Sequence, residues 1–188
     1  MSKPTLIGLS GLAGSGKDTA ATALLANGYA CMAFADPMRS MLRELLLHSV
    51  GDDSYMVHRK LKEQEIAGIG VSYRHLAQTL GTEWGRAIAP DFWIRIAEAT
   101  MNFRLRMSGN QPMRFVVSDV RFANEAAWIR ERGGVIWRIE RASANPVRHH
   151  VSEQELYQFD ADETLHNNGT IQDLYNMVSR MLGKTVTT

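Results

Sequence analysis

Apolar residues follow two patterns that alternate along the chain, short continuous runs and longer stretches with helical spacing. Short runs bounded by Gly, Pro or polar residues are typical of strands. The runs that fit this description are 6–9, 29–35, 115–119, 135–139 and, more briefly, 164–166. They predict five short strands.

Stretches with apolar residues three or four positions apart separate these runs and predict helices. The expected helices cover 17–26, 72–86, 122–132 and 171–182, with two more that start at Asp36-Pro37 and at Pro90. After Asp36 the apolar stripe comprises Met38, Met41, Leu42, Leu45 and Leu46, and after Pro90 it comprises Phe92, Ile96, Thr100 and Phe103. Segment 48–70 has the weakest pattern, and we expect it to be mobile or inserted.

The order of these elements is strand, helix, strand, several helices, strand, helix, strand, strand, helix. Alternation of this kind arises from crossover units, which place helices on both faces of a parallel sheet. We find no repeat, linker or second apolar core in the sequence. We therefore expect one α/β domain over 1–188, with a parallel sheet of about five strands.

The composition narrows the class of protein without identifying it. Basic and acidic residues almost cancel, 21 against 20, so no strong positive field predicts a nucleic-acid partner. Of the basic residues 16 are Arg and 5 are Lys, and Arg presents a planar fork that suits carboxylate or phosphate. Cys31 is the single cysteine, and no apolar run approaches the roughly 20 residues that span a bilayer. We expect a cytoplasmic protein that binds neither nucleic acid nor membrane.

A glycine-rich segment between the first strand and the first helix carries the strongest chemical signal. Gly11, Gly16 and Lys17 fit the phosphate-loop pattern, with a strand before it and a helix after it. Backbone N–H groups of such a loop turn inward around phosphate oxygens, and the helix dipole adds to the attraction. Lys17 would reach the β- and γ-phosphates. The predicted phosphate site comprises Gly11, Ala13, Gly14, Ser15, Gly16, Lys17, Asp18 and Thr19.

One position departs from the usual phosphate-loop pattern. The residue after the lysine is commonly Ser or Thr and binds Mg²⁺, but here it is Asp18. Thr19 does not simply replace the missing hydroxyl, because neighbouring residues on a helix face different ways. Asp18 therefore either binds the metal, directly or through water, or only complements the helix dipole. Asp119 ends an expected strand, where proteins with a phosphate loop often place a carboxylate near Mg²⁺.

Further residues distinguish kinases from other proteins with a phosphate loop. Val120 follows Asp119 where a motor ATPase requires an acidic residue, and the Asn-Lys-x-Asp pattern of GTPases is absent. Ligands of parallel sheets lie beyond the carboxyl ends of the strands. The arginines that could reach this region are Arg39, Arg43, Arg74, Arg86 and Arg121. A phosphate-monoester acceptor is already anionic, so its reaction needs alignment and charge neutralisation but no general base.

Several segments resemble the bacteriophage-type deoxynucleoside monophosphate kinases. The phosphate loop with Asp after its lysine is similar to theirs, and residues 74–86 are similar to their central helix. Residues 118–125 resemble their third motif, Ser-Asp-Val-Arg-Phe-Ala-Asn-Glu in this sequence. The tail also resembles this family at His150, Ser152, Glu153, Asp162 and 167–170. The resemblance extends from the first strand to the last helix.

This resemblance implies a P-loop fold in which ATP, with Mg²⁺, phosphorylates a deoxynucleoside 5′-monophosphate. Residues from about 36 to 110 would form a helical region that binds the acceptor, and about 142 to 160 a lid-like segment with Arg148 and His150. The expected catalytic residues are Lys17, Asp18, Asp119 and Arg121, of which Asp18 and Asp119 would hold the metal. The expected acceptor-binding residues are Arg39, Arg74, Gln78, Arg86 and Glu125.

Other interpretations stay open at this point. The phosphate loop is shared with kinases of dephospho-coenzyme A and of phosphomevalonate, and with switch or motor subunits that hydrolyse ATP. The apolar helices between residues 72 and 107 could supply a homodimer surface. A phage-encoded protein of this kind would act in the cytoplasm of its host.

Overall fold

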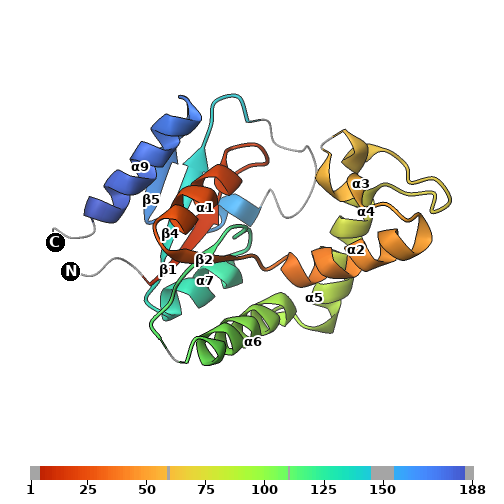
Figure 1. Ribbon diagram of the computed structural model, residues 1–188, viewed down its shortest axis with the longest axis horizontal. Coiled ribbons are helices and arrows are strands. Elements are labelled where there is room, and N and C mark those ends of the chain that lie inside the picture. Colours follow the sequence, from red (N-terminus) through yellow and green to blue (C-terminus); the bar gives the residue numbers. More distant parts are fainter. Residues whose placement is uncertain (1–4, 59, 110, 145–154, 185–188) are drawn as a thin grey trace. The chain divides into compact units, whose positions relative to one another are not determined.

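Five parallel strands form one sheet in the order β2-β3-β1-β4-β5 (Figure 1). The computed structural model describes residues 5–58, 60–109, 111–144 and 155–184. The strands are β1 (Leu6–Ser10), β2 (Tyr29–Met32), β3 (Arg114–Val117), β4 (Val135–Glu140) and β5 (Glu163–His166). Every neighbouring pair is parallel, which confirms the sheet expected from the sequence. β2 ends earlier than predicted, although Ala33 and Phe34 after it are buried.

Helices cover both faces of this sheet (Figure 1). α1 (Lys17–Ala26) and α9 (Ile171–Lys184) lie against one face, and α7 (Ala123–Glu131) lies against the other. The core beneath α1 and α9 contains side chains that are at most 2% exposed, among them Ile7, Leu9, Leu24, Trp137 and Leu174. On the opposite face a Cβ atom at Gly8 would lie 2.5 Å from Cδ1 of Ile129. Glycine at this position therefore lets α7 pack closely against β1.

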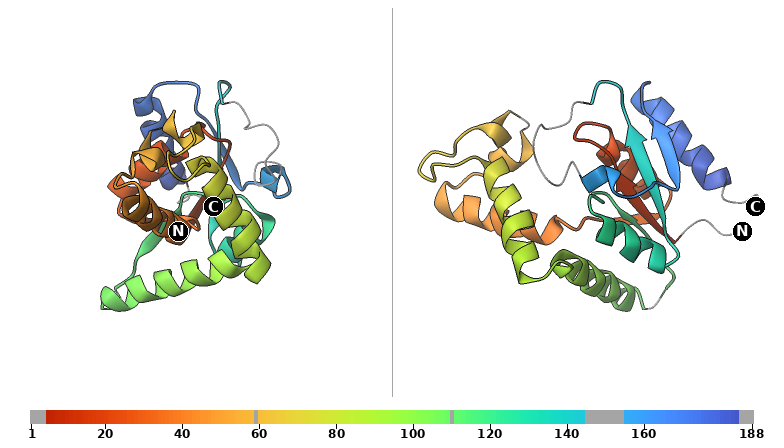
Figure 2. Two further views of the ribbon diagram at one scale, coloured as in Figure 1. Left: turned by 90° about the vertical axis from the view of Figure 1, so that its right-hand side faces the viewer. Right: turned by 180° about the vertical axis from the view of Figure 1, so that it is seen from behind.

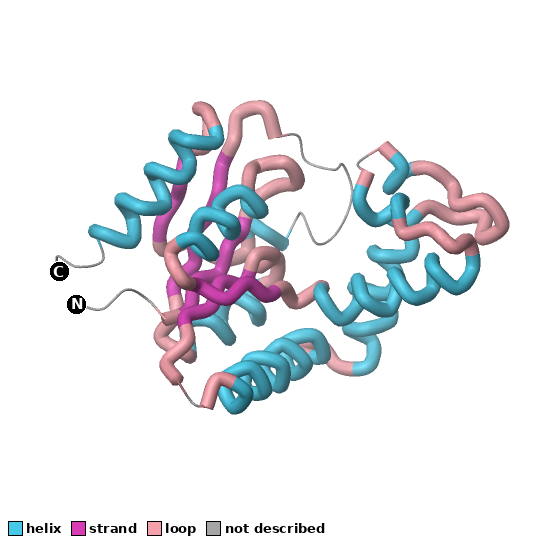
Figure 3. The backbone as a smooth tube through the Cα atoms, in the orientation of Figure 1, coloured by secondary structure: helices cyan, strands magenta, loops and turns pink. Residues whose placement is uncertain are grey.

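The chain divides into two compact units, one formed by residues 1–34 and 97–188 and one by residues 35–96. All five strands, drawn in magenta in Figure 3, belong to the first unit, as does η3 (Glu155–Tyr157). The second unit is helical and comprises α2 (Asp36–Ser49), α3 (Ser54–Val57), η1 (Leu61–Glu63), α4 (Tyr73–Gln78), η2 (Thr79–Trp84) and α5 (Gly85–Ile88). α6 (Phe92–Met107) begins in this second unit and ends in the first. Figure 2 shows the same elements from two further directions.

The apolar stripe predicted for α2 is buried along only part of its width. Met38, Leu42 and Leu46 are buried. Met41 and Leu45 are 45% and 42% exposed, because at helical spacing both lie along one edge of the stripe. The apolar stripe predicted from the sequence is therefore wider than the face that is buried, and Met41 lies outside that face.

In α6 the buried face differs from the predicted stripe. The buried side chains are Trp93, Ile94 and Ala97, whereas Phe103 is 55% exposed. Apolar residues occupy several neighbouring positions in this helix, so spacing alone did not identify the face that is covered.

The described residues of segment 48–70 include the short helices α3 and η1, although the pattern in the sequence is weak. The Ile66 side chain is fully buried, and its N–H donates to the Val71 carbonyl oxygen at 3.0 Å. The helix predicted over 72–86 is present but contains a π-helical turn at Thr79–Trp84. Among the helices that the structure describes, none is long and apolar enough to cross a membrane.

Candidate active site

The phosphate loop between β1 and α1 depends on three glycines with positive φ. The angle is +140° at Gly11, +80° at Gly14 and +108° at Gly16, a region that other residues adopt only with strain. Space also excludes a side chain at Gly11, because a Cβ atom would lie 2.3 Å from the Ile139 carbonyl oxygen. The loop therefore lies directly against the end of β4.

Lys17 begins α1, and its side chain folds back over the loop. Its ammonium group donates to the carbonyl oxygens of Gly11 and Leu12 at 2.8 and 2.9 Å. The positive charge thus lies at the amino-terminal end of α1, where the helix dipole also favours an anion. Asp18 is exposed beside it, whereas Ala13 and Thr19 are partly buried. Together the ammonium group and the backbone N–H groups of the loop form a set of donors suited to polyphosphate.

Asn167 directly follows β5, and its side chain supports the phosphate loop from the carboxyl end of that strand. Its side chain is 5% exposed, and Nδ2 donates to the Ser15 carbonyl oxygen at 2.8 Å. A Cβ atom on Gly16 would lie 2.3 Å from the same nitrogen, so the amide occupies the space that glycine leaves. Sequence reasoning noted segment 167–170 but assigned no role to Asn167. The sequence does contain one sign of such a role, because Asn167 is a polar residue directly after the expected strand 164–166.

Asp119 follows β3, the strand beside β1, at the same end of the sheet as the phosphate loop. It is 6% exposed, and its Oδ1 accepts a hydrogen bond from the Phe34 backbone N–H at 2.8 Å. The next residue, Val120, donates its N–H to the Leu9 carbonyl oxygen at 3.0 Å. These contacts connect the carboxylate with the ends of three neighbouring strands.

Glu125 lies in the first turn of α7 and closes the turn before it. Its Oε2 accepts hydrogen bonds from the N–H groups of Arg121 and Phe122 at 2.8 and 3.1 Å. The side chain is only 4% exposed. This arrangement is the reciprocal half of a capping box and gives Glu125 a structural role that sequence reasoning missed. Its contact with an acceptor stays a prediction.

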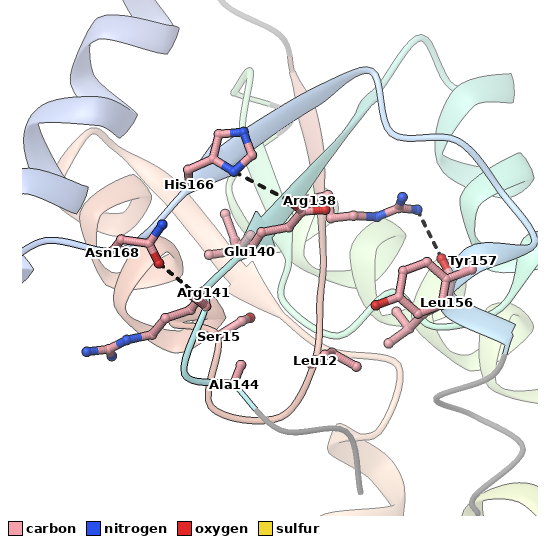
Figure 4. Close-up of a pocket in the computed structure, with 12 residues that line it drawn as sticks. Leu12, Ser15, Arg138, Glu140, Arg141, Ala144, Leu156, Tyr157, His166 and Asn168 are labelled. Atoms are coloured by element: carbon pink, nitrogen blue, oxygen red, sulfur yellow. Dashed lines mark hydrogen bonds and ion pairs between the residues drawn. The ribbon is translucent and has the colours of Figure 1, made fainter. Parts of the chain in front are cut away.

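A pocket of about 300 Å³ lies beside the phosphate loop (Figure 4). It is lined by Leu12, Ser15, residues 138–142, Ala144, Leu156, Tyr157, His166 and Asn168. Oδ1 of Asn168 accepts a hydrogen bond from the Ala142 backbone N–H at 2.8 Å, which holds the segment after β4 at the rim of the pocket. The Ser15 hydroxyl is buried without a hydrogen-bond partner among the described residues. Its lining combines apolar side chains such as Leu12 and Leu156 with charged ones such as Arg138 and Glu140.

Four of the predicted acceptor-binding residues belong to the helical unit, residues 35–96. Arg39 pairs with Asp36 at 3.2 Å, Arg74 pairs with Glu63, and Arg86 donates to the Pro90 carbonyl oxygen at 3.1 Å. Gln78 lies four residues after Arg74, at the end of α4. The predicted lid residues, Arg148 and His150, lie outside the described residues.

Arg39 of α2 lies near the start of α4. Burial raises the pKa of the Tyr73 phenol above its ordinary value, and the positive charge of Arg39 acts in the opposite direction. Arg39 is therefore close to Tyr73, the residue that precedes Arg74 in the chain.

Comparison with known proteins shows the family. Residues 69–178 match the deoxynucleotide monophosphate kinase family, and this is more than half of the chain. A protein of Acanthamoeba polyphaga mimivirus, itself assigned as a deoxynucleotide monophosphate kinase by inference, is 36% identical over 183 residues. The match covers 92% of this chain and 93% of the viral protein. The chain belongs to the deoxynucleotide monophosphate kinase family. This confirms the resemblance noted in the sequence and makes the protein a phosphotransferase.

Solved structures agree with the P-loop kinase fold of this deoxynucleotide monophosphate kinase. A Thermus thermophilus protein has a TM-score of 0.51 at 19% identity, over 97% of the kinase and 98% of that chain. Dephospho-CoA kinase from Campylobacter jejuni has a TM-score of 0.52 at 11% identity, over 96% of each chain. At these identities the similarity concerns the fold alone.

We predict that Asn167→Ala weakens the use of ATP by the kinase. Loss of the buried hydrogen bond to Ser15 removes about 1–2 kcal/mol that holds the loop, so kcat/KM for ATP should fall roughly tenfold. Steady-state kinetics at varied ATP measure the effect. Asn176→Ala is the matched control, because this asparagine of α9 is exposed and its Oδ1 accepts a hydrogen bond from the neighbouring Gln172 at 3.2 Å. Equal kinetics for the two variants would show that Asn167 does not support the loop.

Proposed function

We propose that the kinase transfers the γ-phosphoryl group of ATP to a deoxynucleoside 5′-monophosphate and so forms the diphosphate. Family membership supports the class of reaction. The observation that carries the donor site is the pocket beside the phosphate loop, to which Leu12 and Ser15 both contribute (Figure 4). A nucleotide with its phosphates in the loop would have its base in this pocket.

The donor phosphates would bind to residues 11–19. Backbone N–H groups and the Lys17 ammonium group supply positive charge, and the buried Ser15 hydroxyl offers one more hydrogen bond. Because these groups are held before the reaction, they stabilise charge that develops on the transferred phosphoryl group without reorganising. Arg121, exposed after Asp119, would add a further cation there.

The carboxylates of Asp18 and Asp119 would hold Mg²⁺, directly or through water. Mg²⁺ prefers oxygen ligands and is commonly bound by one or two carboxylates together with substrate phosphates. The residues fit this requirement, since one carboxylate follows the loop lysine and the other lies at the end of the adjacent strand. When bound, the ion supplies charge neutralisation between the phosphates.

The acceptor monophosphate would bind to the arginines of the helical unit. Arg39, Arg74 and Arg86 are permanently charged, and their planar forks match phosphate oxygens. Gln78 lies on the same side of α4 as Arg74, because the two are four residues apart. An oxygen of the acceptor phosphate attacks the γ-phosphorus as ADP leaves, and no base is required because that oxygen is already anionic.

Several expectations stay predictions. They are a lid that includes Arg148 and His150, an acceptor contact of Glu125, a homodimer, a cytoplasmic location and a single kinase domain with the boundaries given above. The helical unit, 35–96, falls within the predicted acceptor-binding region of about 36 to 110.

The reaction is tested by ADP release from Mg·ATP with a panel of deoxy- and ribonucleoside monophosphates. We expect at least one deoxynucleoside monophosphate to raise turnover well above the rate without acceptor. Dephospho-coenzyme A and phosphomevalonate belong in the same panel. Turnover that depends on either of these instead, or ADP release that no acceptor increases, would contradict the proposed function.

Lys17→Ala should abolish transfer while the fold is kept. Removal of the ammonium group from the loop is expected to lower kcat by at least about 100-fold, since it takes a preorganised charge from the transition state. Circular dichroism and thermal unfolding check the fold. Lys60→Ala, at an exposed position before η1, should behave as the unchanged protein. Normal activity of the Lys17 variant would mean that the phosphate loop is assigned wrongly.

Arg74→Ala should impair use of the acceptor and leave use of ATP nearly unchanged. Loss of a charged hydrogen-bond donor to phosphate should raise KM for the monophosphate roughly tenfold or more. Arg95→Ala is the control, because Arg95 also forms a surface ion pair with a carboxylate, that of Asp91 at 2.8 Å. A selective loss of ATP binding in the Arg74 variant would show that Arg74 belongs to the donor site, and the proposed acceptor role would be wrong.

A further inference from the structure

The helix that carries Arg74 and Gln78 continues to Ile88, but its winding changes part-way. α4 is followed by the π-helical turn η2 and then by α5. An α-helix turns by about 100° per residue, and a π-helical turn contains one residue more than an α-helical turn. Each residue after η2 therefore faces about the direction that the residue before it would face in a continuous α-helix, about 100° back around the helix axis. As a result, side chains four residues apart stay nearly in line along the whole segment.

Side-chain exposure follows this four-residue repeat. Tyr73 and Gly85 are both buried, although in a continuous α-helix these positions would face directions about 120° apart. His75, Glu83 and Ala87 are all exposed. We call the row of Tyr73, Ala77, Gly81 and Gly85 the buried row; its two middle members are partly buried. The row of His75, Thr79, Glu83 and Ala87 is the exposed row, in which Thr79 alone is partly buried.

Trp93 of α6 holds the π-helical turn in place. Its Nε1 donates to the Gly81 carbonyl oxygen at 2.6 Å. A Cβ atom at Gly85 would lie 2.4 Å from the same nitrogen, so the indole packs directly against the backbone of both glycines. Gly81 and Gly85 belong to the buried row. The contact explains how a turn with poorer internal hydrogen bonding is kept in the middle of a helix.

The row beside the buried one consists of Arg74, Gln78, Thr82 and Arg86, all of which are partly buried. The π-helical turn brings Arg86 into this row, because in a continuous α-helix it would be rotated by about 80° from Gln78. Three of the four residues are the acceptor-binding residues of the proposed function, on which this inference rests. We propose that Thr82 is the fourth and that its hydroxyl binds the acceptor nucleotide.

The chemistry of Thr82 suits this position. Its hydroxyl both donates and accepts hydrogen bonds, and it carries no charge. In a row with two arginines, it would contact a phosphate oxygen or the 3′-hydroxyl of the deoxyribose. The arginines neutralise the phosphate, while the hydroxyl fixes the orientation of the nucleotide. Thr82 is therefore proposed as a substrate-binding residue and not as a proton donor.

Thr82→Val tests the proposal, because it removes the hydroxyl and keeps the shape of the side chain. We expect KM for the deoxynucleoside monophosphate to rise about tenfold, equivalent to about 1.4 kcal/mol, with KM for ATP within twofold of the wild type. Thr79→Val is the matched control, since Thr79 belongs to the same π-helical turn and is partly buried like Thr82, but shares its row with His75, Glu83 and Ala87 and not with the arginines. Thr82→Ser retains the hydroxyl and should restore the acceptor KM.

Each outcome bears on a different part of the argument. If Arg74→Ala raises the acceptor KM but Thr82→Val does not, the proposed role of Thr82 is wrong and the proposed function stands. If Thr82→Ser is as impaired as Thr82→Val, the hydroxyl is not responsible and the proposal also fails. If wild-type protein uses no nucleoside monophosphate, the proposed function itself fails. Thermal unfolding of all three threonine variants identifies any effect that comes from loss of the fold.

Discussion

A loop that turns its N–H groups inward to bind phosphate cannot use the same groups to stabilise itself. In this kinase Lys17 donates to the Gly11 and Leu12 carbonyl oxygens within the phosphate loop, and groups outside the loop supply further support. Gly11 lies against the Ile139 carbonyl at the end of β4, and the Asn167 amide after β5 donates to the Ser15 carbonyl. The ends of β4 and β5 therefore both support the loop of the proposed donor site.

The same end of the sheet also carries Asp119 and Arg121, the other residues of the proposed donor site. Asp119 is held by the backbone of Phe34, and Glu125 fixes the turn that carries Arg121. Both carboxylates are almost fully buried and accept hydrogen bonds from backbone N–H groups, which satisfies charges that would otherwise be costly to bury. Rigid support of this kind keeps catalytic groups in position without contributions from the substrate.

The parallel sheet and the phosphate loop could be predicted because their signals are local. Apolar runs and the glycines before Lys17 are visible within a few residues of sequence. The contact of Asn167 could not be predicted, since it joins residues 152 positions apart. Burial was also difficult to predict, as Met41 shows, because it depends on which neighbour covers a helix. Glu125 was expected at the acceptor, and its role in the turn before α7 emerged only from its hydrogen bonds.

The π-helical turn accommodates one residue more than a continuous α-helix would need between Gln78 and Arg86. A relative that lacked one residue between 79 and 84 could wind as a continuous α-helix, and the equivalent of Arg86 would then lie seven residues after Gln78, about 20° from it around the helix axis. The two arginines of the proposed acceptor row would therefore keep their alignment. A one-residue gap at this point in an aligned relative would not by itself indicate a different acceptor site.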